Sequence, residues 1–252
     1  MSLSFAKPTT RTIIRTLIPI GTALLAFVVT GFLLLAGGFD PLEAYGLILQ
    51  GSVGGVREGG ETLVRTTSLL LTGLAVGFAF RCKIWNIGAE GQLYFGAIGA
   101  VVIALTVVGQ IPVFGIIIAI IFAMIFGAGW AAIAGVLKSR LGVNEIIVTV
   151  MLNFIAILFV DFLVHGALKA PGFEPQTALI PLTSQLPILI EGTRLHAGFL
   201  VAIAAAVLIY LILFKTKTGF SLRATGVNPK ASGYAGINVK RSILLTLLIS
   251  GA

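Results

Sequence analysis

Five polar side chains interrupt an apolar stretch of the chain between residues 81 and 92. They are two cations, two amides and a carboxylate, namely Arg81, Lys83, Asn86, Gln92 and Glu90. Neither residues 69–80 nor residues 93–137 contain a charged side chain. Because a charge near the core of a bilayer costs several kcal/mol unless it is paired or hydrated, this group of residues is predicted to be a functional site. Its amides both donate and accept hydrogen bonds, which suits the binding of a neutral polar molecule.

The glycine-rich part of this group has two possible structures. Residues 86–92 either turn at the membrane surface or dip into the membrane as a broken helix, which is allowed where the backbone lines a cavity. A pair of half-helices with a break between them is a recurring feature of transporter substrate sites. Glu90 either locks the turn by pairing with Arg81 or Lys83, or contacts the substrate directly. The structural role is favoured.

Three polar residues of a later apolar stretch extend the set of candidates. Asn144 and Glu145 stand at its start, where an asparagine caps a helix and a carboxylate favours the positive N-terminus, so capping explains both. Asn153 lies deeper in the stretch. It is either a hydrogen-bonding link between helices or a residue that faces a substrate path.

The composition of the chain indicates a membrane protein. Of its 252 residues, 58% are hydrophobic and only 10% are charged, whereas soluble domains carry about 25% charged residues. The predicted fold class is all-α, a polytopic transmembrane helical bundle that forms a single domain over residues 1–252. The net charge of +8 is attributed to the excess of Lys and Arg in cytoplasmic loops, and no partnership with nucleic acid is expected.

Recurring apolar runs predict about six to seven spans with the N-terminus in the cytoplasm. The expected spans are residues 16–39, 61–80, 88–109, 112–137, 144–164 and 195–214, and a seventh that starts at residue 242. This alternation places 13 of the 17 Lys and Arg residues inside, among them Lys7, Arg11 and Arg15. The seventh run stops at Ala252 before it can span a bilayer, so the chain is expected to be a truncated, incomplete subunit.

Motifs for catalysis are absent from the sequence. There is no H-E-x-x-H, no G-x-S-x-G and no Cys/His cluster with metal-ligand spacing, so neither an enzyme nor a metal site is expected. The G-x-x-x-x-G-K-[ST] loop that binds nucleotide phosphates is also absent. Any step driven by ATP must therefore use another subunit, and this chain is expected to bind no cofactor.

A basic segment, residues 215–241, is the second informative part of the chain. Within it, Asn228 and Pro229 predict the start of a short helix, because proline is favoured at the first helical position, and Gly236 can end that helix. The segment is either a solvated loop with ordinary positive charge or a cytoplasmic helix that docks into the groove of a partner.

Three separated motifs together resemble one protein family. W-N-I-G-A-E-G-Q at residues 85–92 looks like the N-I-G-A-E-G-Q signature of ABC-transporter permease subunits for nucleosides and simple sugars, in the wider group of ribose and branched-chain amino acid permeases. G-V-N-E at 142–145 with M-L-N at 151–153, and residues 223–237, resemble two further segments of these proteins. Thr225, Ser232 and Gly233 depart from the expected pattern. The resemblance covers roughly residues 40–240.

This resemblance implies a permease of the bacterial inner membrane that works with several partners. They are cytoplasmic ATP-binding subunits, a second permease subunit that is either a copy of this chain or a different one, and an extracytoplasmic substrate-binding lipoprotein. Residues 222–237 are then the loop that couples the permease to the ATPase. The residues of this loop that match the family pattern are Arg223, Gly226, Asn228, Pro229, Tyr234 and Gly236.

The predicted function is inward transport of a nucleoside or simple sugar, driven by ATP that separate subunits hydrolyse. Hydroxyls and base edges need donors and acceptors rather than a net charge. The expected path residues are Asn86, Glu90, Gln92 and Asn153. A branched-chain amino acid permease is the alternative within the class, and its substrate would favour a fixed charge or a helix terminus in the path. An ion-coupled secondary transporter is the alternative from another class.

Overall fold

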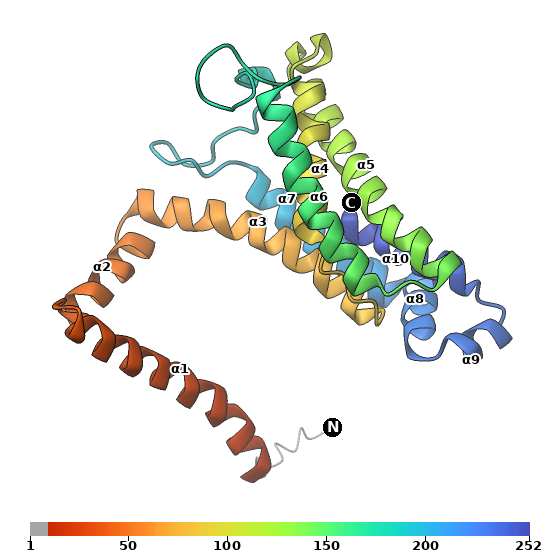
Figure 1. Cartoon of the computed structure of the whole chain (residues 1–252), viewed down its shortest axis with the longest axis horizontal. Coiled ribbons are helices and arrows are strands. Elements are labelled where there is room, and N and C mark those ends of the chain that lie inside the picture. Colours follow the sequence, from red (N-terminus) through yellow and green to blue (C-terminus); the bar gives the residue numbers. More distant parts are fainter. Residues whose placement is uncertain (1–9) are drawn as a thin grey trace, which may run out of the picture. The chain divides into compact units, whose positions relative to one another are not determined.

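A computed structural model describes residues 10–252, with side chains described from Leu17 onward except at Val107. The described residues form ten α-helices and no strand beyond one isolated bridge (Figure 1). Of the cations expected on the cytoplasmic side of the first span, Lys7 lies outside the described residues. The chain divides into two compact units, Met1–Thr62 and Leu63–Ala252, which are described separately.

The first unit contains a long apolar helix and a shorter one. α1 (Thr10–Ala36) is followed by α2 (Pro41–Val53), whose start is capped by Asp40. The Asp40 carboxylate accepts two backbone N–H groups of the first turn of α2, and proline occupies the first helical position. The Tyr45 hydroxyl donates to the backbone oxygen of Phe27 at 2.6 Å. This bond ties α2 to α1.

A short irregular segment separates α3 from α4 in the second unit. α3 (Val56–Arg81) ends at a turn in which Lys83 adopts the left-handed backbone conformation, with φ +57°. Glycine usually occupies that position of a helix C-terminus. α4 (Ala89–Ala104) begins after residues 84–88, which belong to no helix. We call residues 84–88 the break.

The next two helices are joined by a tight connection that carries positive charge. α5 (Phe114–Val136) passes into one turn of π-helix, η2 (Leu137–Leu141), and α6 (Glu145–His165) follows. Gly142 turns the chain between them with φ +68°. The Asn144 side chain accepts a backbone N–H of the first turn of α6, which confirms the predicted cap.

Two short 3-10 turns lie where α4 ends and α5 begins. η1 (Val107–Gln110) follows α4, and η3 (Leu182–Ser184) lies in the irregular segment between α6 and α7. The hydroxyls of Thr183 and Ser184 donate to the backbone oxygen of Gly109 at 2.9 and 2.6 Å. These two bonds attach the long irregular segment to the end of the helix pair.

The basic segment 215–241 is mostly helical, whereas one of the two expectations was a solvated loop. α7 (Gly198–Lys215) is followed by α8 (Lys217–Val227), α9 (Pro229–Tyr234) and α10 (Val239–Gly251). α8 and α9 lie at the end of the second unit where α10 begins, at the lower right of Figure 1. The predicted short helix at Pro229 is confirmed. The helix that precedes it was not predicted.

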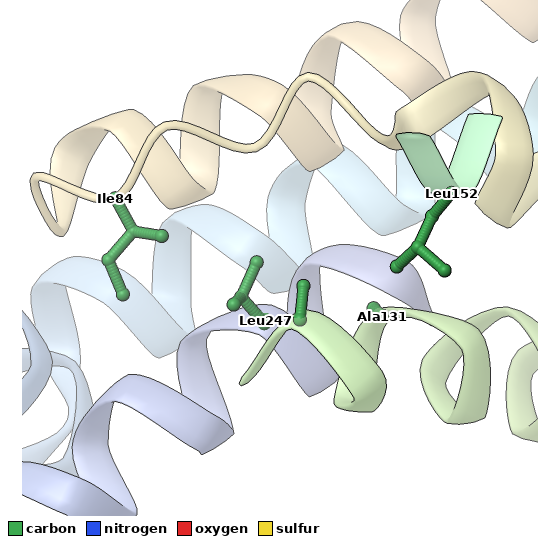
Figure 2. Packing of buried hydrophobic residues seen from close by; sticks show 5 residues of the cluster. Ile84, Ala131, Leu152 and Leu247 are labelled. Atoms are coloured by element: carbon green, nitrogen blue, oxygen red, sulfur yellow. The ribbon is translucent and has the colours of Figure 1, made fainter. Parts of the chain in front are cut away.

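Small residues allow the helices of the second unit to approach closely. Ile84, Ala131, Ala134, Leu152 and Leu247 are buried against one another (Figure 2). The alanines belong to α5, and close approach at small residues is the usual way in which membrane helices associate. The cluster joins the break to α5, α6 and α10. Most large apolar side chains elsewhere are exposed, as expected for helices surrounded by lipid.

Five described helices are long and apolar enough to cross a membrane, counting α1 from Leu17. They are Leu17–Ala36, Val56–Arg81, Phe114–Leu141, Glu145–His165 and Gly198–Lys215. The third expected span, residues 88–109, is shorter in the structure because the α-helix stops at Ala104 and η1 follows. At about 1.5 Å per residue, the 16 residues of α4 extend about 24 Å, less than the ~30 Å hydrocarbon core.

Candidate functional site

Two amides of the break and α4 form a closed pair in the interior. Asn86 Nδ2 donates to Gln92 Oε1 at 3.0 Å, and Gln92 Nε2 donates to Asn86 Oδ1 at 3.0 Å. Asn86 Nδ2 also donates to Ser250 Oγ of α10 at 2.8 Å, and Ser250 Oγ donates to the backbone oxygen of Ala75 at 2.7 Å. Asn86 is fully buried. These bonds connect α3, the break, α4 and α10.

Side chains of α6 satisfy backbone groups of the break and of the first turn of α4. Thr149 Oγ1 accepts the N–H of Ile87 at 3.3 Å. Asn153 Nδ2 donates to the Ile87 oxygen and Asn153 Oδ1 accepts the N–H of Gly91, both at 2.8 Å. Buried backbone groups need such partners. An added Cβ at Gly91 would lie 2.9 Å from Asn153 Oδ1, so the close approach requires glycine.

One ion pair fixes the start of α6 against the break. Glu145 forms a salt bridge with Lys138 of η2, and its other carboxylate oxygen accepts the N–H of Trp85 at 3.4 Å. The Glu145 side chain is largely buried, so the pair shields a charge that would otherwise be unfavourable there. The sequence suggested only that Glu145 favours the N-terminus of its helix. In the structure Glu145 also joins η2 and the break.

The structure brings together three of the four expected path residues and separates the fourth. Asn86, Gln92 and Asn153 bond to one another or to the break, so their polar groups are already occupied by protein. Glu90 is exposed on α4. Within the described part of the chain it forms no ion pair with Arg81 or Lys83, so the expected lock of the turn is not formed by this residue.

Two members of the site were missed by sequence reasoning. We call Asn86, Gln92, Thr149, Asn153 and Ser250 the polar network. Thr149 could have been found, because Glu145, Thr149 and Asn153 are spaced by four residues and so share one face of α6. Ser250 gives the same kind of signal, because Ser242, Thr246 and Ser250 are also spaced by four residues and so share one face of α10.

The second candidate segment presents both a buried and an exposed side. The Arg223 guanidinium lies over the ring of Phe214, 5.1 Å from its centroid. Asn228 caps α9 by accepting the N–H of Ala231 at 3.0 Å, and Gly236, with φ +82°, turns the chain after α9. Tyr234 is almost fully exposed at 94%. An exposed aromatic side chain in this basic segment is available to a partner protein.

The space between α4 and α6 is too small for a nucleoside or sugar. A cavity of about 90 Å³ lies there, lined mainly by apolar side chains that include Tyr94, Ile98 and Val160. Small-molecule sites usually have volumes of about 300–1,000 Å³. In the conformation described, this cavity is therefore not a substrate site.

Comparison with protein families gives a match to the family described as "Branched-chain amino acid transport system / permease component", over residues 60–252. The chain is 36% identical over 241 residues to the guanosine ABC transporter permease protein NupP of Bacillus subtilis, covering 94% of this chain and 68% of the relative. It is 33% identical over 247 residues to the nucleoside ABC transporter permease protein NupB of Lactococcus lactis, with the same coverage.

A relative named for glucose is similar to a nearly equal extent. The glucose ABC transporter permease protein TsgB13 of Haloferax volcanii is 33% identical over 249 residues, covering 93% of this chain and 64% of the relative. The chain thus spans about two thirds of the length of these relatives. No solved structure matches the chain.

Proposed function

Because this chain belongs to the family of branched-chain amino acid transport system permease components, we propose that it is the permease subunit of an ABC importer that carries nucleosides inward. The observation that carries the proposal is its similarity, over nearly its whole length, to permeases named for guanosine and nucleosides. Its apolar helices and its family make it a multi-pass protein of the bacterial cytoplasmic membrane.

A neutral polar substrate suits the chemistry of the break. Amide and hydroxyl groups dominate the polar network, and the buried carboxylate beside it, Glu145, is already paired with Lys138. Among the described residues, the network itself therefore holds no unpaired charge for the carboxylate or ammonium of an amino acid, and the charged Glu90 lies outside it. The relative named for glucose supports a simple sugar as the second candidate substrate, since sugars need the same donors and acceptors.

We assign the four expected path residues to two roles. Asn86, Gln92 and Asn153 hold the shape of the break, because their polar atoms are bonded within the chain. Glu90 faces away from this network on α4 and is the residue offered to the substrate path. A second permease subunit, as a copy of this chain or a different one, would complete the path.

The charge distribution supports a cytoplasmic position for α8 and α9. Ten of the 13 Lys and Arg residues of the second unit belong to elements that meet at one end (Figure 1). These are Arg81, Lys83, Lys138, Arg140, Lys215, Lys217, Arg223, Lys230, Lys240 and Arg241. Such a bias marks the cytoplasmic side of membrane proteins. The exposed Tyr234 then faces the cytoplasm, where ATP-binding subunits would dock and hydrolyse ATP.

Uptake of radiolabelled guanosine by cells with and without the permease gene tests this proposal. We expect uptake that depends on the gene, that excess unlabelled adenosine or guanosine blocks, and that excess leucine leaves unchanged. Competition by glucose or ribose instead would move the substrate to sugars, and competition by leucine would move it to amino acids.

The energy source separates an ABC importer from an ion-coupled carrier. An ionophore that collapses ion gradients while ATP is maintained should leave uptake in place, and ATP depletion should abolish it. The opposite pattern would contradict the assignment as an ABC permease. A substrate-binding lipoprotein is expected to be required as well, so cells that lack it serve as a second control.

A further inference from the structure

The end of α8 lies directly on the turn that ends α3. Leu222 of α8 is buried in a cluster with Phe78, Cys82 and Leu213. One turn further along α8, a Cβ added to Gly226 would overlap the carbonyl group of Cys82 and lie 3.1 Å from the Cβ of Lys83. Only glycine allows this approach, and the surface it meets is backbone rather than a flexible side chain.

The turn beneath Gly226 is poorly able to absorb a displacement. Lys83 already holds a left-handed backbone conformation with φ +57°, which is unfavourable for a residue with a side chain. The N–H groups of Cys82, Lys83 and Ile84 are bonded to the last turn of α3. A force applied at Cys82 is therefore passed along the chain to the break, and Asn86 lies three residues beyond Lys83.

We propose that the contact of Gly226 with Cys82 and Lys83 transmits movement of the α8–α9 segment to the polar network. Displacement of α8 would shift the turn, and the turn would shift Asn86 relative to its partners Gln92 and Ser250. Gly226 is thus a positioning residue that acts through the backbone of the break. This inference rests on the proposed function, because it supposes that ATP-binding subunits move α8 and α9.

The substitution Gly226→Ala tests the contact, and Gly77→Ala is its matched control. Both glycines lie in helices and neither has a left-handed backbone, so each loses the same conformational freedom on substitution. A Cβ at Gly77 meets nothing within 4 Å. The two variants therefore differ in whether the added methyl group pushes α8 away from the turn.

The measurement is the number of ATP molecules hydrolysed for each guanosine transported by the complete complex in proteoliposomes. Gly226→Ala should raise this ratio by about 2- to 30-fold, the range seen for changes within coupled networks. Gly77→Ala should leave it at the wild-type value. A role in folding alone would lower the amount of complex, and hence both rates together, without changing the ratio.

Each result supports or contradicts one proposal. A wild-type complex that transports, with equal ratios for Gly226→Ala and Gly77→Ala, overturns the transmission role and leaves the importer assignment intact. Failure of the wild-type complex to transport guanosine overturns the proposed substrate, and the ratio is then measured with glucose as the transported substrate. If Gly226→Ala does not assemble, Leu222→Ala is measured in its place, because removing this buried side chain loosens the same contact. For the inference to stand, Leu222→Ala must raise the number of ATP molecules hydrolysed for each guanosine transported.

Discussion

Asn86 is a buried amide whose hydrogen-bonding groups are all used by the protein. It takes part in four hydrogen bonds, with Gln92 twice, with Ser250 and with the N–H of Gly88. Asn86→Ala would leave these partners unpaired in the interior, at about 1–3 kcal/mol for each buried group. We expect this variant to lower the thermal unfolding midpoint of the purified complex. The midpoint is the temperature at which half of the protein no longer stays monodisperse after heating.

Glu90→Ala is the control variant for the stability measurement on Asn86→Ala. Glu90 is exposed, and exposed substitutions usually change stability by no more than about 0.5 kcal/mol. The unfolding midpoint should therefore stay at the wild-type value, while guanosine uptake falls if Glu90 lies on the path. Equal losses of stability in both variants would contradict the separation of roles between Asn86 and Glu90.

Sequence alone located most residues of the site but not their partners. A polar side chain in an apolar run stands out, which is why Asn86, Gln92 and Asn153 were predicted. Whether such a side chain faces substrate or protein depends on what lies opposite it. For Asn86 that partner is Ser250, 164 residues later in the chain, and no local pattern predicts such a pairing.

The turn that ends α3 stores conformational strain in a residue that is not glycine. A left-handed backbone costs an L-amino acid about 1–2 kcal/mol, and Lys83 has φ +57°. Lys83→Gly should remove this cost, partly offset by the greater freedom of glycine in the unfolded chain. We expect a rise of about 0.5–1 kcal/mol in the free energy of unfolding, measured by denaturation of the purified protein in mixed micelles.

Gly142→Ala is the reciprocal change in the turn between η2 and α6. Gly142 has φ +68°, and an added Cβ would meet nothing within 4 Å. Only backbone strain is therefore introduced, and stability should fall by about 1–2 kcal/mol. If Lys83→Gly were instead destabilising, the lysine side chain would have to contribute more than its backbone costs.

The limits of helices were harder to predict than their order. The apolar run 88–109 looks continuous, yet α4 ends at Ala104, because hydropathy does not register the change from α-helix to the tighter turn η1. In the opposite sense, glycines and charges in α8 suggested a loop. Thr216 caps that helix by accepting the N–H of Gly219 at 3.0 Å, and burial of Leu222 adds the packing that favours helix there.

The whole second unit has a charge asymmetry that fixes its expected orientation. Leu141, in η2, lies at the end rich in cations, and Leu179 lies in the irregular segment that bonds to the other end. Their exposed fractions are 70% and 94%. With a maleimide that does not cross membranes, Leu179→Cys should be labelled in intact cells, and Leu141→Cys should be labelled only after the membrane is opened.

The native thiol gives little background in this labelling. Cys82 is buried, and burial raises the pKa of its thiol, although Thr246 and Arg223 act in the opposite direction. The reactive thiolate is therefore scarce at neutral pH, and labelling of the unsubstituted protein should remain slow until it is denatured. Labelling of Leu141→Cys in intact cells would contradict the cytoplasmic position proposed for α8 and α9.

The fold class followed from composition because only membrane-spanning helices accommodate so many apolar residues with so few charges. The arrangement of those helices did not follow, since every apolar run looks equally able to face lipid or a neighbour. Packing such as that of the cluster that contains Ala131 and Leu247 (Figure 2) depends on small residues at particular depths. The sequence contains these small residues at many positions that turn out to be open.

The distance along the chain between Asn86 and Ser250 has a consequence for biosynthesis. At about 5–20 residues per second, a ribosome needs on the order of 10–30 s to add the 164 residues between them. Throughout that time, α3 and α4 are made and can enter the membrane, but Asn86 lacks one of its acceptors and the Ala75 oxygen lacks the additional donor that Ser250 provides. The break can therefore take its final form only after α10 has been synthesised and inserted.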